Sequence, residues 1–180
     1  TIPQAIMGSA KSFSATKVSV NIGISQNNVL SRPIFLAPLV RDGTQTTVSV
    51  ASGGLVMSSH APGVELHIPA DTIQFPNGSV SGEINIGIVD AEFATVPPLP
   101  FALPDKVISL EPSGVEFSEP IEIVLPNENE LPAGVELVII SLNSQKGIWE
   151  IDGAAVVSDD GESIVTKPEQ GLTHFSQIYV

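Results

Sequence analysis

Apolar and polar residues alternate one by one along much of this chain. The alternation is clearest at residues 18–24, 64–68, 84–88 and 121–125. Because successive side chains of an extended strand point to opposite faces, a period of two predicts strands with one buried face. Residues 135–142 are apolar almost throughout, which is typical of a strand that is buried on both faces.

Turn signals separate these stretches. Four pairs tolerate a positive φ in tight hairpins, namely Asp42-Gly43, Asn77-Gly78, Asp152-Gly153 and Asp160-Gly161. Pro62-Gly63 indicates another turn. Roughly a dozen candidate strands follow one another at the short spacing of sandwiches and barrels. No helical period lasts beyond a single turn, and 15 Gly and 15 Pro do not suit long helices. We therefore predict an all-β fold, an antiparallel β-sandwich.

The first 32 residues differ from the rest of the chain. They hold few Gly or Pro and one clean candidate strand, residues 17–25. We expect residues 1–32 to form an N-terminal arm that completes a sheet, and residues 33–180 to form the sandwich. The arm could pair within its own domain or with the open edge of a neighbouring copy. In the second case the partner of the chain is another copy of itself.

Charge and composition exclude several classes of function. The chain has 20 Asp and Glu against 7 Lys and Arg, for a net charge of -13. Binding to phosphate backbones needs clustered cations, so nucleic acid is not an expected partner. No apolar run reaches the length of about 20 residues that spans a bilayer. The chain has no Cys and three His, which excludes thiolate zinc sites and argues against a His-based metal centre. We expect no cofactor.

Three groups of residues carry a resemblance to a known family. The first is Gly53-Gly54-Leu55 followed by residues 62–70 (PGVELHIPA), the second is residues 107–117 (VISLEPSGVEF) running into residues 120–126, and the third is Trp149 with residues 172–176 (LTHFS). Together they resemble the zona-occludens/netrin-receptor (ZU-five) domain family over residues 53–180. The resemblance implies an antiparallel β-sandwich. Similar modules occur in large prokaryotic surface proteins, and the acidic, Cys-free composition fits an extracellular or cell-surface location.

One motif carries chemistry. Some members of this family cut their own backbone at His-Phe-Ser, which occurs here as His174-Phe175-Ser176. The Ser176 Oγ would attack the Phe175 carbonyl, the acyl group would move from nitrogen to oxygen, and water would hydrolyse the ester. His174 would relay the proton. The alternative is that residues 173–180 are an ordinary closing strand, in which His174 hydrogen-bonds Ser176.

Other candidate sites have simpler explanations. Asp159, Asp160 and Glu162 offer oxygen ligands for calcium, but Asp-Asp-Gly is also a routine hairpin turn. Asn77-Gly78-Ser79 is a formal glycosylation sequon and also a turn. His60 and His67 flank a turn, where two imidazoles without a third ligand make a weak metal site. We expect the large aromatic side chains to anchor the core, and the candidates are Phe13, Phe117, Trp149 and Phe175.

The sequence therefore predicts an extracellular structural module, or a subunit of a cell-surface or filament assembly, that is not an enzyme towards other molecules. The first alternative is a self-cleaving domain that cuts between Phe175 and Ser176. The second is an adhesion or ligand-binding module, for which residues 96–101 are the best candidate patch because they form an apolar, Pro-rich loop.

Overall fold

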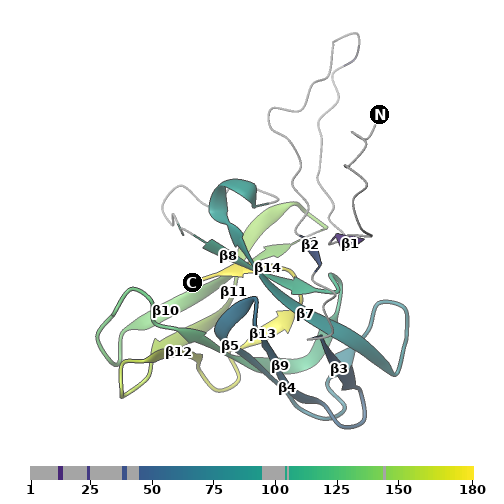
Figure 1. Ribbon diagram of the computed structural model, residues 1–180, viewed down its shortest axis with the longest axis horizontal. Coiled ribbons are helices and arrows are strands. Elements are labelled where there is room, and N and C mark those ends of the chain that lie inside the picture. The colour runs from purple at the N-terminus through teal and green to yellow at the C-terminus, as the bar shows by residue number, and fades with distance from the viewer. Residues whose placement is uncertain are drawn as a thin grey trace.

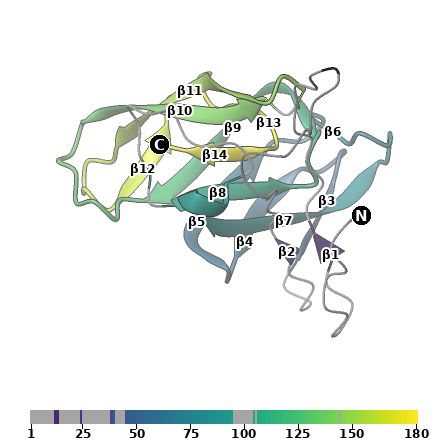
Figure 2. The same ribbon diagram turned by 90° about the horizontal axis from the view of Figure 1, so that it is seen from above.

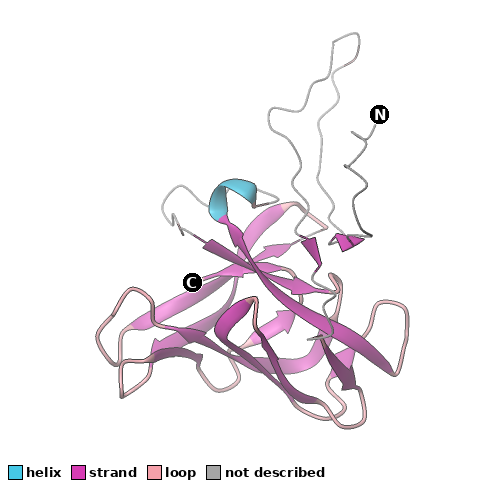
Figure 3. Cartoon of the chain, viewed as in Figure 1, coloured by secondary structure: helices cyan, strands magenta, loops and turns pink. Residues whose placement is uncertain are grey.

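The fold is described from a computed structural model of the 180-residue chain. The structure describes residues 12–13, 24, 38–39, 45–94, 104, 106–143 and 145–180, and of residues 12–13 and 38–39 it describes the backbone alone. Strands make up nearly all of its regular structure (Figure 3). In the described part of the chain, no helix is long and apolar enough to cross a membrane.

The strands are antiparallel throughout (Figure 1). A separate pair is formed by β1 (Ser12–Phe13) and β2 (Pro38–Leu39). The main sheet contains β3 (Thr46–Ser49), β4 (Gly54–Ser58), β5 (Ala61–Ile68), β6 (Ile73–Gln74), β7 (Ser81–Asp90), β8 (Lys106–Glu111), β9 (Glu116–Pro126), β10 (Glu136–Asn143), β11 (Ile148–Val157), β12 (Ser163–Thr166), β13 (Leu172–His174) and β14 (Gln177–Tyr179). A single 3-10 turn, η1 (Ala91–Phe93), follows β7.

The main sheet curls around one core and nearly closes on itself (Figure 2). Its path runs β3-β7-β8-β14-β10-β11-β12-β9-β5-β4, and β6 and β13 pair with β9 beside this path. The two strands at the ends of the path meet at a bridge between Ser49 and Gly53. The predicted antiparallel all-β fold is confirmed, and the strands of the main sheet form one continuous, barrel-like sheet.

The alternating stretches 64–68, 84–88 and 121–125 line the core, whereas 18–24 lies almost wholly outside the described residues. Leu66, Ile86 and Ile123 lie on three different strands and are at most 3% exposed. Phe117 and Phe175 meet edge to face at the centre, with ring centroids 5.2 Å apart. Removing such apolar surface from water is the main force that holds this sheet in its curled form.

A smaller apolar cluster lies on the outer side of the sheet. Trp149 and Tyr179 form an edge-to-face pair with centroids 4.9 Å apart. Ile140 and Leu142 of β10 pack beside them, while Ile139 of the same strand points into the main core. The second half of the apolar stretch 135–142 is therefore buried on both faces, as predicted, whereas its first half has an exposed face.

The turn predictions have different outcomes. Asn77-Gly78 and Asp160-Gly161 do form turns, and both glycines have a positive φ. The predictions for Pro62-Gly63 and Asp152-Gly153 are wrong, because these pairs lie inside β5 and β11. Asp42-Gly43 lies outside the described residues. A Cβ at position 153 would overlap the carbonyl oxygen of Gln170. Gly153 is therefore required by close backbone packing rather than by a turn.

The predicted arm falls mostly outside the described residues. Of residues 1–32, the structure describes the backbone of β1 and Ile24, which lies in a turn. The candidate strand 17–25 is otherwise outside the described part, as are the side chain of Phe13 and the loop 96–101. Pairing of the arm therefore stays a prediction.

Candidate functional site

The His-Phe-Ser motif lies where the chain passes from one part of the sheet to another. His174 ends β13, which pairs with β9, while Ser176 precedes β14, which pairs with β8 and β10. The prediction of a single closing strand over residues 173–180 is therefore wrong. Phe175 interrupts it, because its fully buried ring enters the core beside Phe117.

Backbone hydrogen bonds hold the Phe175–Ser176 peptide on both sides. The Phe175 N–H donates to the Val115 carbonyl over 2.9 Å, and the Leu110 N–H donates to the Ser176 carbonyl over 2.9 Å. The Gly114 N–H lies 3.5 Å from the Phe175 carbonyl oxygen. A backbone N–H that faces this oxygen is the kind of donor that stabilises the negative charge of a tetrahedral intermediate.

His174 is anchored through one of its two ring nitrogens. Its Nδ1 lies 3.3 Å from Thr173 Oγ1 and 3.7 Å from Asp152 Oδ2. The Thr173 hydroxyl donates to Asp152 Oδ1 over 2.7 Å. Because the Thr173 hydroxyl donates its proton to the carboxylate, its oxygen can only accept a hydrogen bond from the imidazole. We therefore assign the imidazole proton to Nδ1, which donates to Thr173. In neutral His174 this leaves Nε2 as the basic nitrogen.

Asp152 reaches this position through an irregularity in β11. In the pairing with β10, Ile139 faces Gly153 and Ile140 faces Ile151, so Asp152 is an extra residue without a partner. Such a β-bulge redirects the side chain of the extra residue. Sequence analysis missed Asp152, which lies 22 positions before His174. Its only signal was an Asp-Gly pair, and that pair was interpreted as a turn.

Ser176 is buried and points elsewhere. It is 5% exposed, and its Oγ donates to the Gln177 carbonyl over 3.1 Å. Among the described residues, no hydrogen bond joins His174 to Ser176, so the hydrogen bond expected between them is absent. For Ser176 to attack the Phe175 carbonyl, its hydroxyl must first leave Gln177.

A pocket of about 320 Å³ gives solvent access to His174 and Phe175 of the motif. Three of the residues that line it are His174, Phe175 and Gly114. The remaining lining residues are Glu116, Phe117, Asn143, Gln145 and Thr173. A water molecule that enters this pocket therefore comes close to the base and to the residue whose carbonyl would be attacked.

The candidate calcium ligands form a turn. Asp160 Oδ1 accepts hydrogen bonds from the Ser158 hydroxyl at 2.6 Å and from the Glu162 N–H at 3.0 Å. The Ser158 hydrogen bond holds the pKa of Asp160 below its usual value. Asp159 is exposed at the tip of the turn. No group of three or more metal-ligating side chains was found in the described part of the chain.

The other candidates lie apart from the His-Phe-Ser motif. His67 bridges two carboxylates on the exposed face of the sheet, with Nδ1 2.8 Å from Glu122 Oε1 and Nε2 3.3 Å from Glu65 Oε2. Its two nitrogens therefore already contact acids. Asn77 is exposed, and its Oδ1 accepts the Ser79 N–H over 3.0 Å, which is a local turn contact.

Comparison of the chain with models of protein families, with curated proteins and with solved structures finds no match. The resemblance to the ZU-five family therefore stays a prediction from the sequence motifs.

Proposed function

We propose that this chain is a structural module or subunit of an extracellular, cell-surface or filament assembly of a prokaryote, and that it acts on no separate substrate. The observation that supports this function is the position of strand β14. β14 lies between β8 and β10, near the middle of the sheet path rather than at its edge (Figure 1).

This central position holds β14 firmly in the sheet. Gln177, Ile178 and Tyr179 are at most 7% exposed, and their backbone pairs with a strand on each side. A buried strand that is paired on both sides opens locally much less readily than an exposed edge strand. Fraying of β14 would expose the core, so the fold resists local opening there. A module that is exposed to proteases or tension needs this property.

The test of assembly uses the full chain. If residues 17–25 add a strand to a neighbouring copy, light scattering should show a mass that rises with protein concentration. Val20→Pro removes a backbone donor from that strand and should abolish the rise. Val20→Ala keeps the donor and should retain it. A monomer at every concentration, with an arm that resists protease, would contradict pairing between copies.

A second function, self-cleavage between Phe175 and Ser176, is favoured by a specific observation. The Asp152 carboxylate and the Thr173 hydroxyl face Nδ1 of His174, so that Nε2 is available as a base. This is the logic by which an acid orients a catalytic histidine. After a cut, residues 176–180 would stay in place, because β14 is paired on both sides.

The intact mass of the denatured protein tests self-cleavage directly. Cleavage would give a species that ends at Phe175 and a separate peptide of residues 176–180. Ser176→Ala removes the nucleophile and should leave one full-length mass, whereas Ser118→Ala alters an exposed serine on β9 and should not prevent the cut. Asp152→Asn should slow cleavage because it weakens the orientation of His174. A single full-length mass for the unmodified chain would refute this function.

A further inference from the structure

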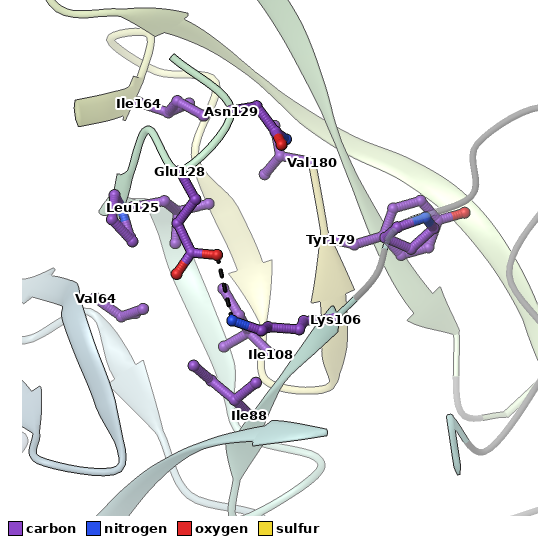
Figure 4. Close-up of a pocket in the computed structure, with 12 residues that line it drawn as sticks. Val64, Ile88, Lys106, Ile108, Leu125, Glu128, Asn129, Ile164, Tyr179 and Val180 are labelled. Carbon is purple, nitrogen blue, oxygen red and sulfur yellow. Dashed lines mark hydrogen bonds and ion pairs between the residues drawn. The ribbon is translucent and has the colours of Figure 1, made fainter. Parts of the chain in front are cut away.

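A second cavity lies at the opposite end of strand β14 from the His-Phe-Ser motif (Figure 4). It has a volume of about 160 Å³. Five strands each contribute one branched apolar side chain to its lining: Val64 from β5, Ile88 from β7, Ile108 from β8, Leu125 from β9 and Ile164 from β12. The interior is therefore apolar and is held by the framework of the sheet rather than by loops.

The charged side chains of the cavity come from one strand end and one loop. Lys106 Nζ lies 3.3 Å from Glu128 Oε2, and Asn129 follows in the same loop. The side chains of Lys106 and Glu128 are 50% and 60% exposed. Figure 4 shows this ion pair among the apolar side chains. An exposed pair of this kind is weak, so a charged ligand can compete for either partner.

We infer that this cavity binds a small primary amine with an apolar body, whose ammonium group pairs with Glu128. An apolar cavity of about 150 Å³ accommodates benzene in another protein, so this one is large enough for a phenyl ring or a short branched chain. The apolar body of the ligand would replace water along the five aliphatic side chains, and its charged head would stay at the polar rim.

The acidic residues around the cavity favour an amine over a carboxylate as its ligand. A carboxylate would have to displace Glu128 from Lys106, and it would do so next to Asp90, which faces Lys106 across β7 and β8. Glu130 lies two positions beyond Glu128 and adds another acid to the loop. The net charge of -13 attracts cations to the protein and repels anions from it. An ammonium group displaces Lys106, which can move into solvent.

Three probes of nearly equal shape separate the contributions of charge and cavity. They are 2-phenylethylamine, 2-phenylethanol and phenylacetate, titrated into the full chain while methyl resonances are followed by NMR. For a ligand of this size we expect a dissociation constant on the order of 1 mM. The amine should bind about fivefold more tightly than the alcohol, and phenylacetate should bind most weakly. The shifted signals should come from Ile88, Ile108 and Leu125.

Two variants and one control variant test the site. Glu128→Gln changes an exposed side chain and should bring the amine and the alcohol to within about twofold of each other. Glu119→Gln alters an exposed acid on β9 that does not line the cavity, and should keep the preference for the amine. Ile88→Phe fills the cavity and should abolish binding of all three probes, with folding checked by circular dichroism. Failure of all three probes to bind the unmodified chain, equal or tighter binding of phenylacetate, or an unchanged preference in Glu128→Gln would overturn the inference.

Discussion

Glu111 places a carboxyl group inside the protein at the end of β8. It is 7% exposed, and its Oε2 accepts the Ser113 N–H over 2.7 Å. Burial raises the pKa of Glu111 from 4.5 to about 7, although the Ser113 hydrogen bond acts to lower it. A buried carboxylate loses its hydration, and one backbone donor does not replace that hydration fully. In the unfolded chain the group regains water and its ordinary pKa.

The sign of the effect on stability follows from proton binding. Between about pH 4.5 and pH 7, the folded protein holds a proton on Glu111 that the unfolded chain has released, so the free energy of unfolding falls as the pH rises. A rise in pKa from 4.5 to about 7 corresponds to about 3 kcal/mol. Roughly 2.5 kcal/mol of this loss falls between about pH 5 and about pH 8.

The substitution Glu111→Gln isolates this contribution. Glutamine keeps an oxygen that can accept the Ser113 N–H, but it does not titrate. Urea unfolding at about pH 5 and about pH 8 should show that the stability of the variant relative to the unmodified chain increases by about 2.5 kcal/mol with pH. Glu83→Gln, an exposed acid on β7, is the control and should follow the unmodified chain. Parallel pH profiles of Glu111→Gln and the unmodified chain would refute the reasoning.

Two further predictions concern packing, and urea unfolding checks both. Phe175→Ala should cost about 3 to 5 kcal/mol because it leaves a cavity in the core, whereas Val138→Ala, at a site that is 47% exposed, should cost far less; similar losses would contradict the central role of Phe175. Gly171→Ala should also destabilise strongly, because the added Cβ would overlap the carbonyl oxygen of Ile121. Gly87→Ala places its Cβ where no atom lies within 4 Å and should be tolerated; equal tolerance at position 171 would show that β13 can move away from β9.

The period-two pattern was sufficient to predict the strands but not their neighbours. Val64, Leu66 and Ile68 are buried on β5, as their alternation requires. The same pattern cannot say that β5 pairs with β9, which is more than 50 residues away. Pairing between distant strands depends on which faces fit together around the core. The partners of each strand therefore cannot be inferred from the pattern of a single sequence.

The sequence pattern also did not predict which polar residues are buried. Residues 108–111 (ISLE) alternate like a strand with one exposed face, which would place Glu111 in solvent. The structure instead covers that face, and Ser109 and Glu111 are both less than 9% exposed. Glutamate is seldom buried, so an expectation from residue type alone is wrong here. The raised pKa of Glu111 is a direct consequence of this burial, which removes water from the carboxylate.

The candidate site shows how a local irregularity brings distant residues together. The motif at residues 174–176 was visible in the sequence, because its three residues are adjacent. Asp152 was not, since a regular β11 would pair it with β10 and fix its direction by strict alternation. The extra residue in the pairing of β11 with β10 releases Asp152 from that alternation, and its carboxylate then accepts hydrogen bonds from Thr173. A substitution that removed the bulge would therefore separate Asp152 from His174 while leaving every residue of the motif unchanged.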